Sequence, residues 1–537
     1  MHIDVIDTLE GFNRIKGDWD AVYASDPDAE FFLSWTWISN YLDQVNSPWF
    51  VLAAKPGRGA SAYVAFLPLR LRTKLRKGDD FHFYNEINMA GHHAADYTGF
   101  ICSPAFEDRA VPALGRYLNK LNWTRLHLDN LYASERRMQL FLKKFPSKRF
   151  DTTERDVIDT TDNINHSICP RVTLPADWDT YLTTKLGSST RQKVRRFLRK
   201  IEESDEFRIT HADQDTIERD IKILLRFWEL KWAPRKGSRT ASLLRFNSTM
   251  LSRCFASGSL FLPVLWRGAT PLAALATLVD PVKRSLLFYI GARDETFNSP
   301  PPGFILHAHS IRCAIINGFA TYDFLRGNEP YKYAFGPDER RLRCLRVTTK
   351  NRRNLGDKLD PRSVPAVLRR TIELHKAGQL VVAERGYRQI LEADARYAPA
   401  LDGLGQLMAA KGDHGQAKRL LRALVAVRPD SHGAWFRLGQ SLQACGEVAA
   451  AAEAYRDAVL RQHEFPVAHY ALGCALLKLG EFDEALAAFE TALALKPDDA
   501  KAEVGRANAL AMIQRAAPSR PAHHSLRNAG TRLPTLH

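Results

Sequence analysis

Residues 322–332 read Tyr-Asp-Phe-Leu-Arg-Gly-Asn-Glu-Pro-Tyr-Lys. The first four residues are apolar apart from one acid, which is typical of the end of a buried strand, and the Arg-Gly pair that follows ends such a strand. Small and apolar residues at 304–316 predict a helix directly before it. Because α/β proteins often carry functional groups at strand ends, we predict that 322–332 form one wall of a functional site.

Outward from this stretch, residues 166–350 predict a mixture of helices and antiparallel strands. An apolar stripe with a polar opposite face predicts a helix over 188–203. Two further helices are expected before Gly258, in addition to the one at 304–316. The strands are expected near 207–210, 260–266, 272–279, 286–292, 321–325 and 342–348. This order of elements is similar to the GNAT acyltransferase fold.

The similarity extends to particular motifs. Pro302-Gly303 ahead of the helix and the stretch 322–332 after it resemble the CelD-like acetyltransferases of cellulose and exopolysaccharide gene clusters. These are relatives of the Fem-type peptidyltransferases, which carry two GNAT-like lobes. The resemblance covers 20–350 and implies an α+β fold of tandem lobes with mainly antiparallel sheets. It also implies acyl transfer from acetyl-CoA or another acyl-CoA to a sugar or an envelope or polysaccharide precursor.

One segment departs from the usual GNAT pattern. Typical members bind the pyrophosphate of acetyl-CoA with an Arg or Gln followed at fixed spacing by two glycines. Here 296–304 contains one glycine and three prolines, and proline has no backbone N–H to donate. The first turn of the following helix, at Gly303 and Phe304, remains as a candidate anion site because helix N-termini carry free N–H groups.

Basic residues on the helix 188–203 are a second candidate for donor binding. Arg191 and Arg195 lie on its polar face, where they either form an ordinary solvated surface or attract a phosphate-bearing ligand.

The first lobe is predicted over 1–165 with a mainly antiparallel sheet. Its loop from Gly91 ends with Asp96 and Tyr97. We predict that these two residues contact the acceptor. The adjacent His92 and His93 do not predict a metal site, since neighbouring side chains point apart.

The acids and proton donors of 322–332 are the candidates for catalysis. Asp323 and Glu329 are the predicted general bases, and Tyr331 and Lys332 the predicted donors to a leaving thiolate or to an anionic substrate. A structural ion pair between Asp323 and a neighbouring cation is the alternative. No metal is expected, because His307 and His309 are two positions apart and do not share a helix face.

The C-terminal part repeats with a period of 34 residues. Glycines recur at 378, 412, 446 and 480, and alanines at 383, 417, 451 and 485. This period resembles the tetratricopeptide repeat, a helix-turn-helix unit. We expect a linker at 351–363, four repeats with a capping helix over 364–515, and a disordered tail at 516–537. By resemblance, a protein partner would contact the first-helix residues Asp402, Gln406, Phe436, Gln440 and Tyr470.

Composition narrows the class of protein. Seven scattered cysteines predict reduced thiols and a cytoplasmic location, and no apolar stretch predicts membrane insertion. The net charge of +16 favours anionic partners. Two alternatives to acyl-CoA chemistry stay open: aminoacyl transfer from charged tRNA, and a non-catalytic scaffold in which the repeats are the functional part.

Overall fold

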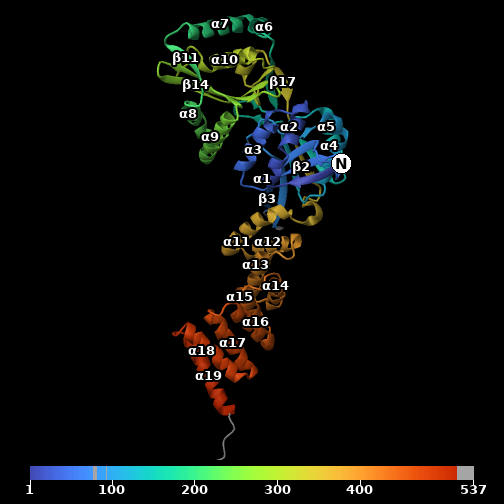
Figure 1. Ribbon diagram of the computed structural model, residues 1–537, viewed down its shortest axis with the longest axis vertical. Coiled ribbons are helices and arrows are strands. Elements are labelled where there is room, and N and C mark those ends of the chain that lie inside the picture. The colour runs from blue at the N-terminus through green and yellow to red at the C-terminus, as the bar shows by residue number, and fades with distance from the viewer. Residues whose placement is uncertain (77–80, 92–93, 517–537) are drawn as a thin grey trace, which may run out of the picture. The chain divides into compact units, whose positions relative to one another are not determined.

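The computed structural model describes residues 1–76, 81–91 and 94–516. The chain forms two compact units, Met1–Pro365 and Ala366–His537. The first contains two mixed sheets with flanking helices, and the described part of the second is all helical, so the predicted fold class is confirmed (Figure 1). No helix among the described residues is long and apolar enough to cross a membrane.

The first lobe is built around an eight-stranded sheet. The strands that precede the second lobe are β1 (His2–Ile6), β2 (Trp49–Lys55), β3 (Ala65–Arg76), β4 (His82–Met89), β5 (Ile101–Cys102), β6 (Arg125–Leu131) and β7 (Phe150–Glu154). Its helices are α1 (Leu9–Arg14), α2 (Lys16–Ser25), α3 (Trp35–Gln44), α4 (Glu107–Leu118) and α5 (Glu135–Leu142). A two-stranded ribbon, β8 (Ile158–Asp159) and β9 (Ile164–Asn165), leads to the second lobe.

The second lobe contains another eight-stranded sheet. Its strands are β10 (Ile168–Thr173), β11 (Phe207–His211), β12 (Leu260–Phe261), β13 (Pro263–Arg267), β14 (Thr270–Asp280), β15 (Ser285–Arg293), β16 (Thr321–Asp323) and β17 (Asp338–Arg341). Its helices are α6 (Trp178–Thr184), α7 (Ser188–Glu202), α8 (Ile217–Lys236), α9 (Thr240–Ala256) and α10 (Pro302–Ile316). Figure 1 shows α7 and α10 on one face of this sheet and α8 and α9 on the other.

The two sheets repeat one topology. The first has the order β1-β2-β3-β4-β6-β18-β7, in which β18 is Arg343–Thr349. The second has the order β11-β13-β14-β15-β16-β10-β17. In both orders the fourth and fifth strands are parallel, namely β4 with β6 and β15 with β16. All other neighbouring pairs in the two orders are antiparallel. The repetition supports the tandem-lobe interpretation of the fold.

One predicted strand belongs to the other lobe. The expected strand near 342–348 is β18 (Arg343–Thr349), which the sequence places in the second lobe because it follows that lobe in the chain. In the structure β18 pairs with β6 and β7 of the first lobe. Its buried Leu345 and Val347 complete the first lobe's core. The predicted extent of the second lobe, 166–350, is therefore corrected, because β18 belongs to the sheet of the first lobe.

The two lobes also share a hydrophobic core. Residues of α1, α2 and α3 pack in one cluster with residues of α8, α9 and β14. Polar contacts join the same surfaces: Glu30 accepts hydrogen bonds from Arg171 at 2.9 Å and from Arg340 at 2.6 Å. A second cluster lies between α7, α10 and the second sheet. The lobes therefore form one folded unit.

The segment predicted as a linker, 351–363, is packed against the first lobe. The side-chain oxygen of Asn354 accepts hydrogen bonds from the backbone N–H of Asn85 and the hydroxyl of Thr124, both at 2.9 Å. Asn354, Leu359 and Asp360 are buried. A polar composition alone does not distinguish such a buried hydrogen-bonded segment from a free linker.

The second unit follows the predicted period. Its helices are α11 (Val364–Lys376), α12 (Leu380–Ala393), α13 (Ala398–Ala410), α14 (His414–Val427), α15 (His432–Ala444), α16 (Val448–Arg461), α17 (Pro466–Leu479), α18 (Phe482–Leu495) and α19 (Ala500–Ala516). Turn glycines such as Gly412 have positive φ, which favours glycine. Within the helices, a Cβ on Gly439 would lie 2.5 Å from the Tyr455 ring, so the glycine permits close packing. The predicted tail beyond 516 lies outside the described residues.

Candidate functional site

The central feature of the second lobe is the divergence of two parallel strands. β15 pairs with β16 only over Ser285–Leu287 and Thr321–Asp323. β15 continues to Arg293, bonded to β14 on its other side. Within the described part of the chain, no strand pairs with β15 on the β16 side beyond Leu287. That edge therefore presents backbone N–H and C=O groups to any chain that lies along it.

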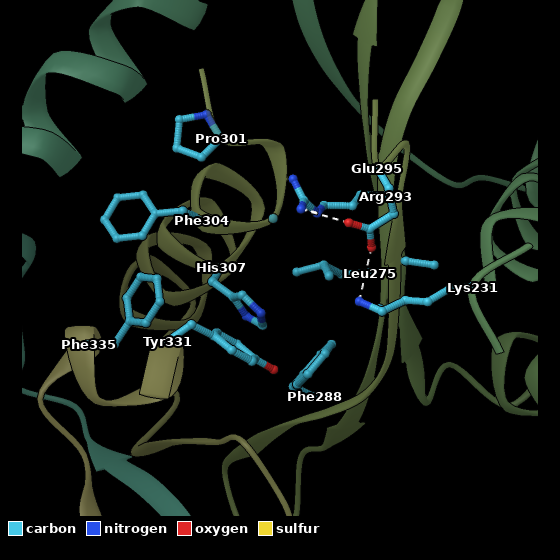
Figure 2. A pocket seen from close by; sticks show the side chains of 13 residues that line it. Lys231, Leu275, Phe288, Arg293, Glu295, Pro301, Phe304, His307, Tyr331 and Phe335 are labelled. Atoms are coloured by element: carbon cyan, nitrogen blue, oxygen red, sulfur yellow. Dashed lines mark hydrogen bonds and ion pairs between the residues drawn. The ribbon is translucent and has the colours of Figure 1, made fainter. Parts of the chain in front are cut away.

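A cavity of about 430 Å³ lies beside this free edge (Figure 2). Its lining comes from α8, β14, β15, the first turns of α10 and the short helix η4 (Pro330–Phe335). The lining residues are Lys231, Leu275, Phe288, Gly291, Ala292, Arg293, Glu295, Pro301, Gly303, Phe304, His307, Tyr331 and Phe335. A cavity of this size and mixed polarity is typical of a small-molecule site.

The N-terminus of α10 forms one end of the cavity. Pro302 begins the helix, and no side chain among the described residues caps it. The N–H groups of Gly303 and Phe304 are in the first turn, where an α-helix has no carbonyl partner for them. Free N–H groups and the helix dipole favour an anion at this position. Both residues line the cavity, and their role in binding an anion stays a prediction.

Charged side chains lie on the opposite side. Lys231 contacts Glu295 at 3.0 Å, and Arg293 contacts it at 2.7 Å. Figure 2 shows these three side chains facing the aromatic residues across the cavity. Burial acts to raise the pKa of Glu295, but the hydrogen bond from Lys231 and the charges of Lys231 and Arg293 outweigh it and lower the pKa. With Glu295 ionised, this group carries one net positive charge.

Aromatic residues form the remaining wall, and His307 lies among them. Its ring centroid is 4.5 Å from that of Phe288 and 5.7 Å from that of Tyr331. Its Nδ1 is 3.0 Å from the hydroxyl of Tyr322, and within the described residues its Nε2 has no hydrogen-bond partner. Burial and the charge of Lys332 lower the pKa of His307 to about 3, so the imidazole is neutral at physiological pH.

Tyr331 brings a hydroxyl to the cavity. Although 46% of its surface is exposed, Figure 2 shows the hydroxyl pointing toward Phe288. Burial, followed by the charge of Glu329, raises the pKa of Tyr331 above its usual value. The phenol is therefore protonated at neutral pH and can donate a hydrogen bond or a proton.

Asp323, predicted as a base, does not line this cavity. Its carboxylate accepts hydrogen bonds from the Tyr97 hydroxyl at 2.8 and 2.9 Å and from the Leu325 N–H at 2.7 Å. Burial raises its pKa to about 6, against the opposing charge of Arg171. A pKa near 6 suits a general base, but the carboxylate is enclosed. The geometry therefore indicates that Asp323 connects the two lobes.

Asp96 and Tyr97, predicted to contact an acceptor, lie in the same inter-lobe contact and outside the cavity lining. Asp96 pairs with Arg326 at 2.9 Å, and Arg326 also donates to the side chain of Asn130 at 2.9 Å. In the structure these residues contact Asp323 and Arg326 in the interface between the lobes, and their predicted contact with an acceptor is not supported at this cavity. His92 and His93 lie outside the described residues.

Glu329 and Lys332 also lie outside the cavity lining. The Lys332 ammonium is buried and donates to the carbonyl oxygens of Arg326 and Gly327 at 2.9 and 3.0 Å. It pairs with Glu329 at 2.8 Å. The backbone has positive φ at Leu325 and at Gly327. Lys332 thus fastens a tight turn that leads directly to Tyr331.

The basic face of α7 does not reach the cavity. Neither Arg191 nor Arg195 lines it, and Arg195 is an exposed side chain 3.7 Å from Asp179. The predicted role of these two residues in donor binding is therefore not supported at this cavity. An amphipathic helix buries its apolar stripe, here Val194, Leu198 and Ile201, and turns its cations to solvent.

Several lining residues escaped prediction. Phe288, Arg293 and Glu295 lie on or just after β15, and Lys231, which is far from them in the chain, joins them only because α8 packs against β15. His307 was considered only as a partner for His309. A signal was present, since His307 is four positions from Gly303 on a predicted helix, and residues i and i+4 share a face.

Known families match both parts of the chain. Residues 188–333 match the family model described as Acetyltransferase (GNAT) domain. Residues 403–467 and 466–499 match two models described as Tetratricopeptide repeat. The chain is also 34% identical over 116 residues to the peroxisomal targeting signal receptor of Eremothecium gossypii. That match covers 20% of this chain and 20% of the receptor, so the chain spans about a fifth of that relative's length.

Solved structures with similar segments include two repeat proteins. The crystal structure of MamA protein is 23% identical, covers 28% of this chain and 89% of its own, and has a TM-score of 0.26. YrrB, titled a TPR protein with an unusual peptide-binding site, is 23% identical, covers 29% of this chain and 86% of its own, and has a TM-score of 0.25. From the family models, the protein contains a GNAT-type acetyltransferase domain at 188–333 and tetratricopeptide repeats toward its C-terminus.

Proposed function

We propose that this protein transfers an acyl group from an acyl-CoA to an amine or hydroxyl group. The observation that carries the proposal is the cavity between the free edge of β15 and the first turn of α10. GNAT domains generally use acyl-CoA as co-substrate, and this cavity lies within the matched domain apart from its last lining residue, Phe335.

The phosphates and the pantetheine arm of an acyl-CoA have counterparts in the cavity. Its phosphates suit the N–H groups of Gly303 and Phe304 together with the cations Arg293 and Lys231. Its pantetheine arm carries amide groups, which can hydrogen-bond to the unpaired edge of β15 as a short extra strand. The apolar methylene groups between the amides suit the aromatic wall. This arrangement compensates for the missing pair of glycines in 296–304.

Tyr331 is the proposed proton donor. In acyl transfer the acceptor's amine or hydroxyl attacks the thioester carbonyl carbon, and the carbon–sulfur bond breaks to release a thiolate. The protonated phenol of Tyr331 would then give its proton to the sulfur. The acceptor releases one proton to solvent as the new bond forms, and the Tyr331 phenolate takes one back from solvent. His307, with a pKa near 3, is a weak base, so its free Nε2 is proposed to position a reactant by hydrogen bonding.

The acceptor and the repeats complete the proposal. The resemblance to CelD-like acetyltransferases supports a saccharide or an envelope precursor as acceptor. The repeats are proposed to bind a protein partner with Phe436, Gln440 and Tyr470, joined by Gln406. Asp402 contributes less, because it already pairs with Arg437 at 2.8 Å. The described cysteines are all free, which supports a reducing, cytoplasmic setting.

Calorimetric titration with acetyl-CoA tests the donor site. A Cβ on Gly303 meets no atom within 4 Å, so Gly303→Leu fits the fold while its side chain enters space beside the cavity. We expect wild type to bind and Gly303→Leu to bind at least about tenfold more weakly, a loss of roughly 1.4 kcal/mol.

The matched control is Gly415→Leu. Gly415 is the second residue of α14, as Gly303 is of α10, and a Cβ there meets only a side-chain oxygen of Asp413 at 3.7 Å. Affinity should be unchanged in this variant. Equal affinity in all three proteins would show that acetyl-CoA binds elsewhere, and absence of binding in wild type would exclude the proposed donor.

A further inference from the structure

A second group of reactive side chains lies on the other side of α10. The imidazoles of His211 and His309 and the thiol of Cys313 place their ligand atoms within 4.8 Å of one another. His211 is the last residue of β11, an edge strand, and His309 and Cys313 are one helical turn apart on α10. None of the three lines the cavity proposed for the donor.

The distances suit a metal ion. Nε2 of His211 is 2.8 Å from Nε2 of His309, and Nε2 of His309 is 3.5 Å from Sγ of Cys313. Tetrahedral zinc with ordinary bond lengths would place two nitrogens about 3.3 Å apart and a nitrogen and a sulfur about 3.6 Å apart. Small rotations of the exposed His211 ring cover the difference. The potential ligand atoms of the three side chains are close enough together to share one ion.

A hydrogen bond between the two imidazoles does not use all of the lone pairs that meet here. A neutral imidazole has one N–H and one acceptor nitrogen, so a contact between two Nε2 atoms uses one proton for both rings.

We propose that His211, His309 and Cys313 bind a single zinc-class divalent ion. Two imidazoles and one thiolate are a donor set that zinc favours, and three protein ligands leave a fourth position for water. The exposed side of His211 gives solvent access to that position. Arg312, whose positive charge acts on His309 and Cys313, pairs with Glu202 of α7. The expectation of no metal from sequence considered His307 with His309 and missed the i, i+4 pair His309 and Cys313.

Such an ion would join β11 to α10. Because the first turns of α10 carry Gly303, Phe304 and His307 to the cavity, a link farther along the helix would restrain the element that shapes the donor site. The role proposed for the ion is therefore structural. It is independent of the acyl-transfer proposal, and it is tested without any acyl donor.

Cobalt(II) titration of the untagged, chelator-treated full chain provides the test. We expect one cobalt per chain, with the absorption band of a thiolate-to-cobalt charge transfer, and displacement of the cobalt by zinc. Cys313→Ser should remove the band, and His211→Ala and His309→Ala should each weaken binding by at least about tenfold. Zinc should also raise the thermal unfolding midpoint of wild type but not of Cys313→Ser.

Matched controls come from the repeats. Cys445→Ser changes an exposed free cysteine, and His414→Ala a histidine remote in sequence, and neither should alter the titration. Absence of a thiolate band in wild type would overturn the site and leave a simple hydrogen bond between two histidines. A band that persists in Cys313→Ser would overturn it as well, because another cysteine would then be the ligand.

Discussion

At the scale of single residues, the stretch 322–332 divides its polar groups between two tasks. Tyr331 faces the cavity, whereas the carboxylate of Asp323 is directed away from it to Tyr97. Burial raises the pKa of Asp323, because the charge of Arg171 and the hydrogen bonds to the carboxylate offset only part of the cost of removing it from water. The carboxylate is enclosed, so a substrate has no route to it. Asp323 therefore makes a structural contact despite its raised pKa, and the Tyr331 hydroxyl is the group of this stretch that lies at the cavity.

Replacing Tyr331 tests this division. Tyr331→Phe removes only the hydroxyl, so we expect kcat for acyl transfer to fall about 10²-fold while the affinity for acyl-CoA changes little. Steady-state kinetics with donor and acceptor varied separately measures both. Tyr333→Phe is the control, because Tyr333 lies two residues away, bonds to Glu339 at 2.5 Å and does not line the cavity. Equal losses in the two variants would refute a specific role for Tyr331.

Asp323 predicts a pH dependence of stability. Its pKa is about 6 in the folded protein and near 4 in the unfolded chain, so the folded state binds this proton more tightly. The resulting stability is fully present below about pH 4 and is lost as pH rises through about 6, an effect on the order of 3 kcal/mol.

Asp323→Asn lacks this titration and keeps an acceptor for Tyr97 and the Leu325 N–H. The free energy of unfolding of wild type minus that of Asp323→Asn should therefore decrease between pH 4 and pH 7. Urea denaturation at several pH values measures the difference. A difference that stays constant with pH would mean that the carboxyl has an ordinary pKa.

At the scale of elements, the turn from Leu325 to Lys332 connects β16 to the cavity. A buried ammonium that serves two carbonyl oxygens and one carboxylate holds this turn. Its loss leaves acceptors without a donor in a buried place, which costs more than the bonds themselves contribute. The turn is therefore a support for Tyr331.

Lys332→Met should destabilise the first unit by roughly 3 kcal/mol, since it leaves Glu329 and two buried carbonyl groups unpaired. Glu329→Gln should cost less than about 1 kcal/mol, because that side chain is partly exposed. Thermal or chemical unfolding of both variants gives the comparison. If Lys332→Met unfolds like wild type, or Glu329→Gln is the more damaging change, the ammonium does not hold the turn.

Much of this element-scale structure is predictable from the sequence. The helices 188–203 and 304–316 and the strands near 207–210, 272–279 and 286–292 follow from local periodicity, and they form α7, α10, β11, β14 and β15. The sheet that β18 joins could not be predicted, because pairing between strands far apart in the chain depends on how all the elements pack.

Within the candidate site, Gly303, Phe304 and Tyr331 were predictable from a motif. Lys231 and Arg293 were not, since only the packed fold brings them together.

At the scale of the whole molecule, the chain combines two compact units. The repeats are stabilised by contacts between successive helices, so a local defect should weaken neighbouring repeats. The two lobes of the first unit share a hydrophobic core, and β18, which follows the second lobe in the chain, pairs within the sheet of the first. The lobes should therefore unfold together. These different designs predict that damage to one unit leaves the other folded.

Gly439→Ala tests this independence. The added Cβ would meet the Tyr455 ring at 2.5 Å, so the repeats should lose about 1–3 kcal/mol through overpacking. The unfolding transition of the repeats should shift to lower temperature while affinity for acetyl-CoA stays unchanged. Gly433→Ala is the control, because its Cβ meets only the Arg437 guanidinium at 3.6 Å. A fall in acetyl-CoA affinity in Gly439→Ala alone would show that the units are coupled.

The most direct test of the account is an experimental structure of the full chain with coenzyme A. We predict density for the pantetheine arm along the edge of β15 from Phe288 to Arg293, with the phosphates at Gly303 and the thiol beside Tyr331. Density at another surface, or an empty cavity in crystals that contain saturating coenzyme A, would contradict the claim that this cavity is the acyl-donor site.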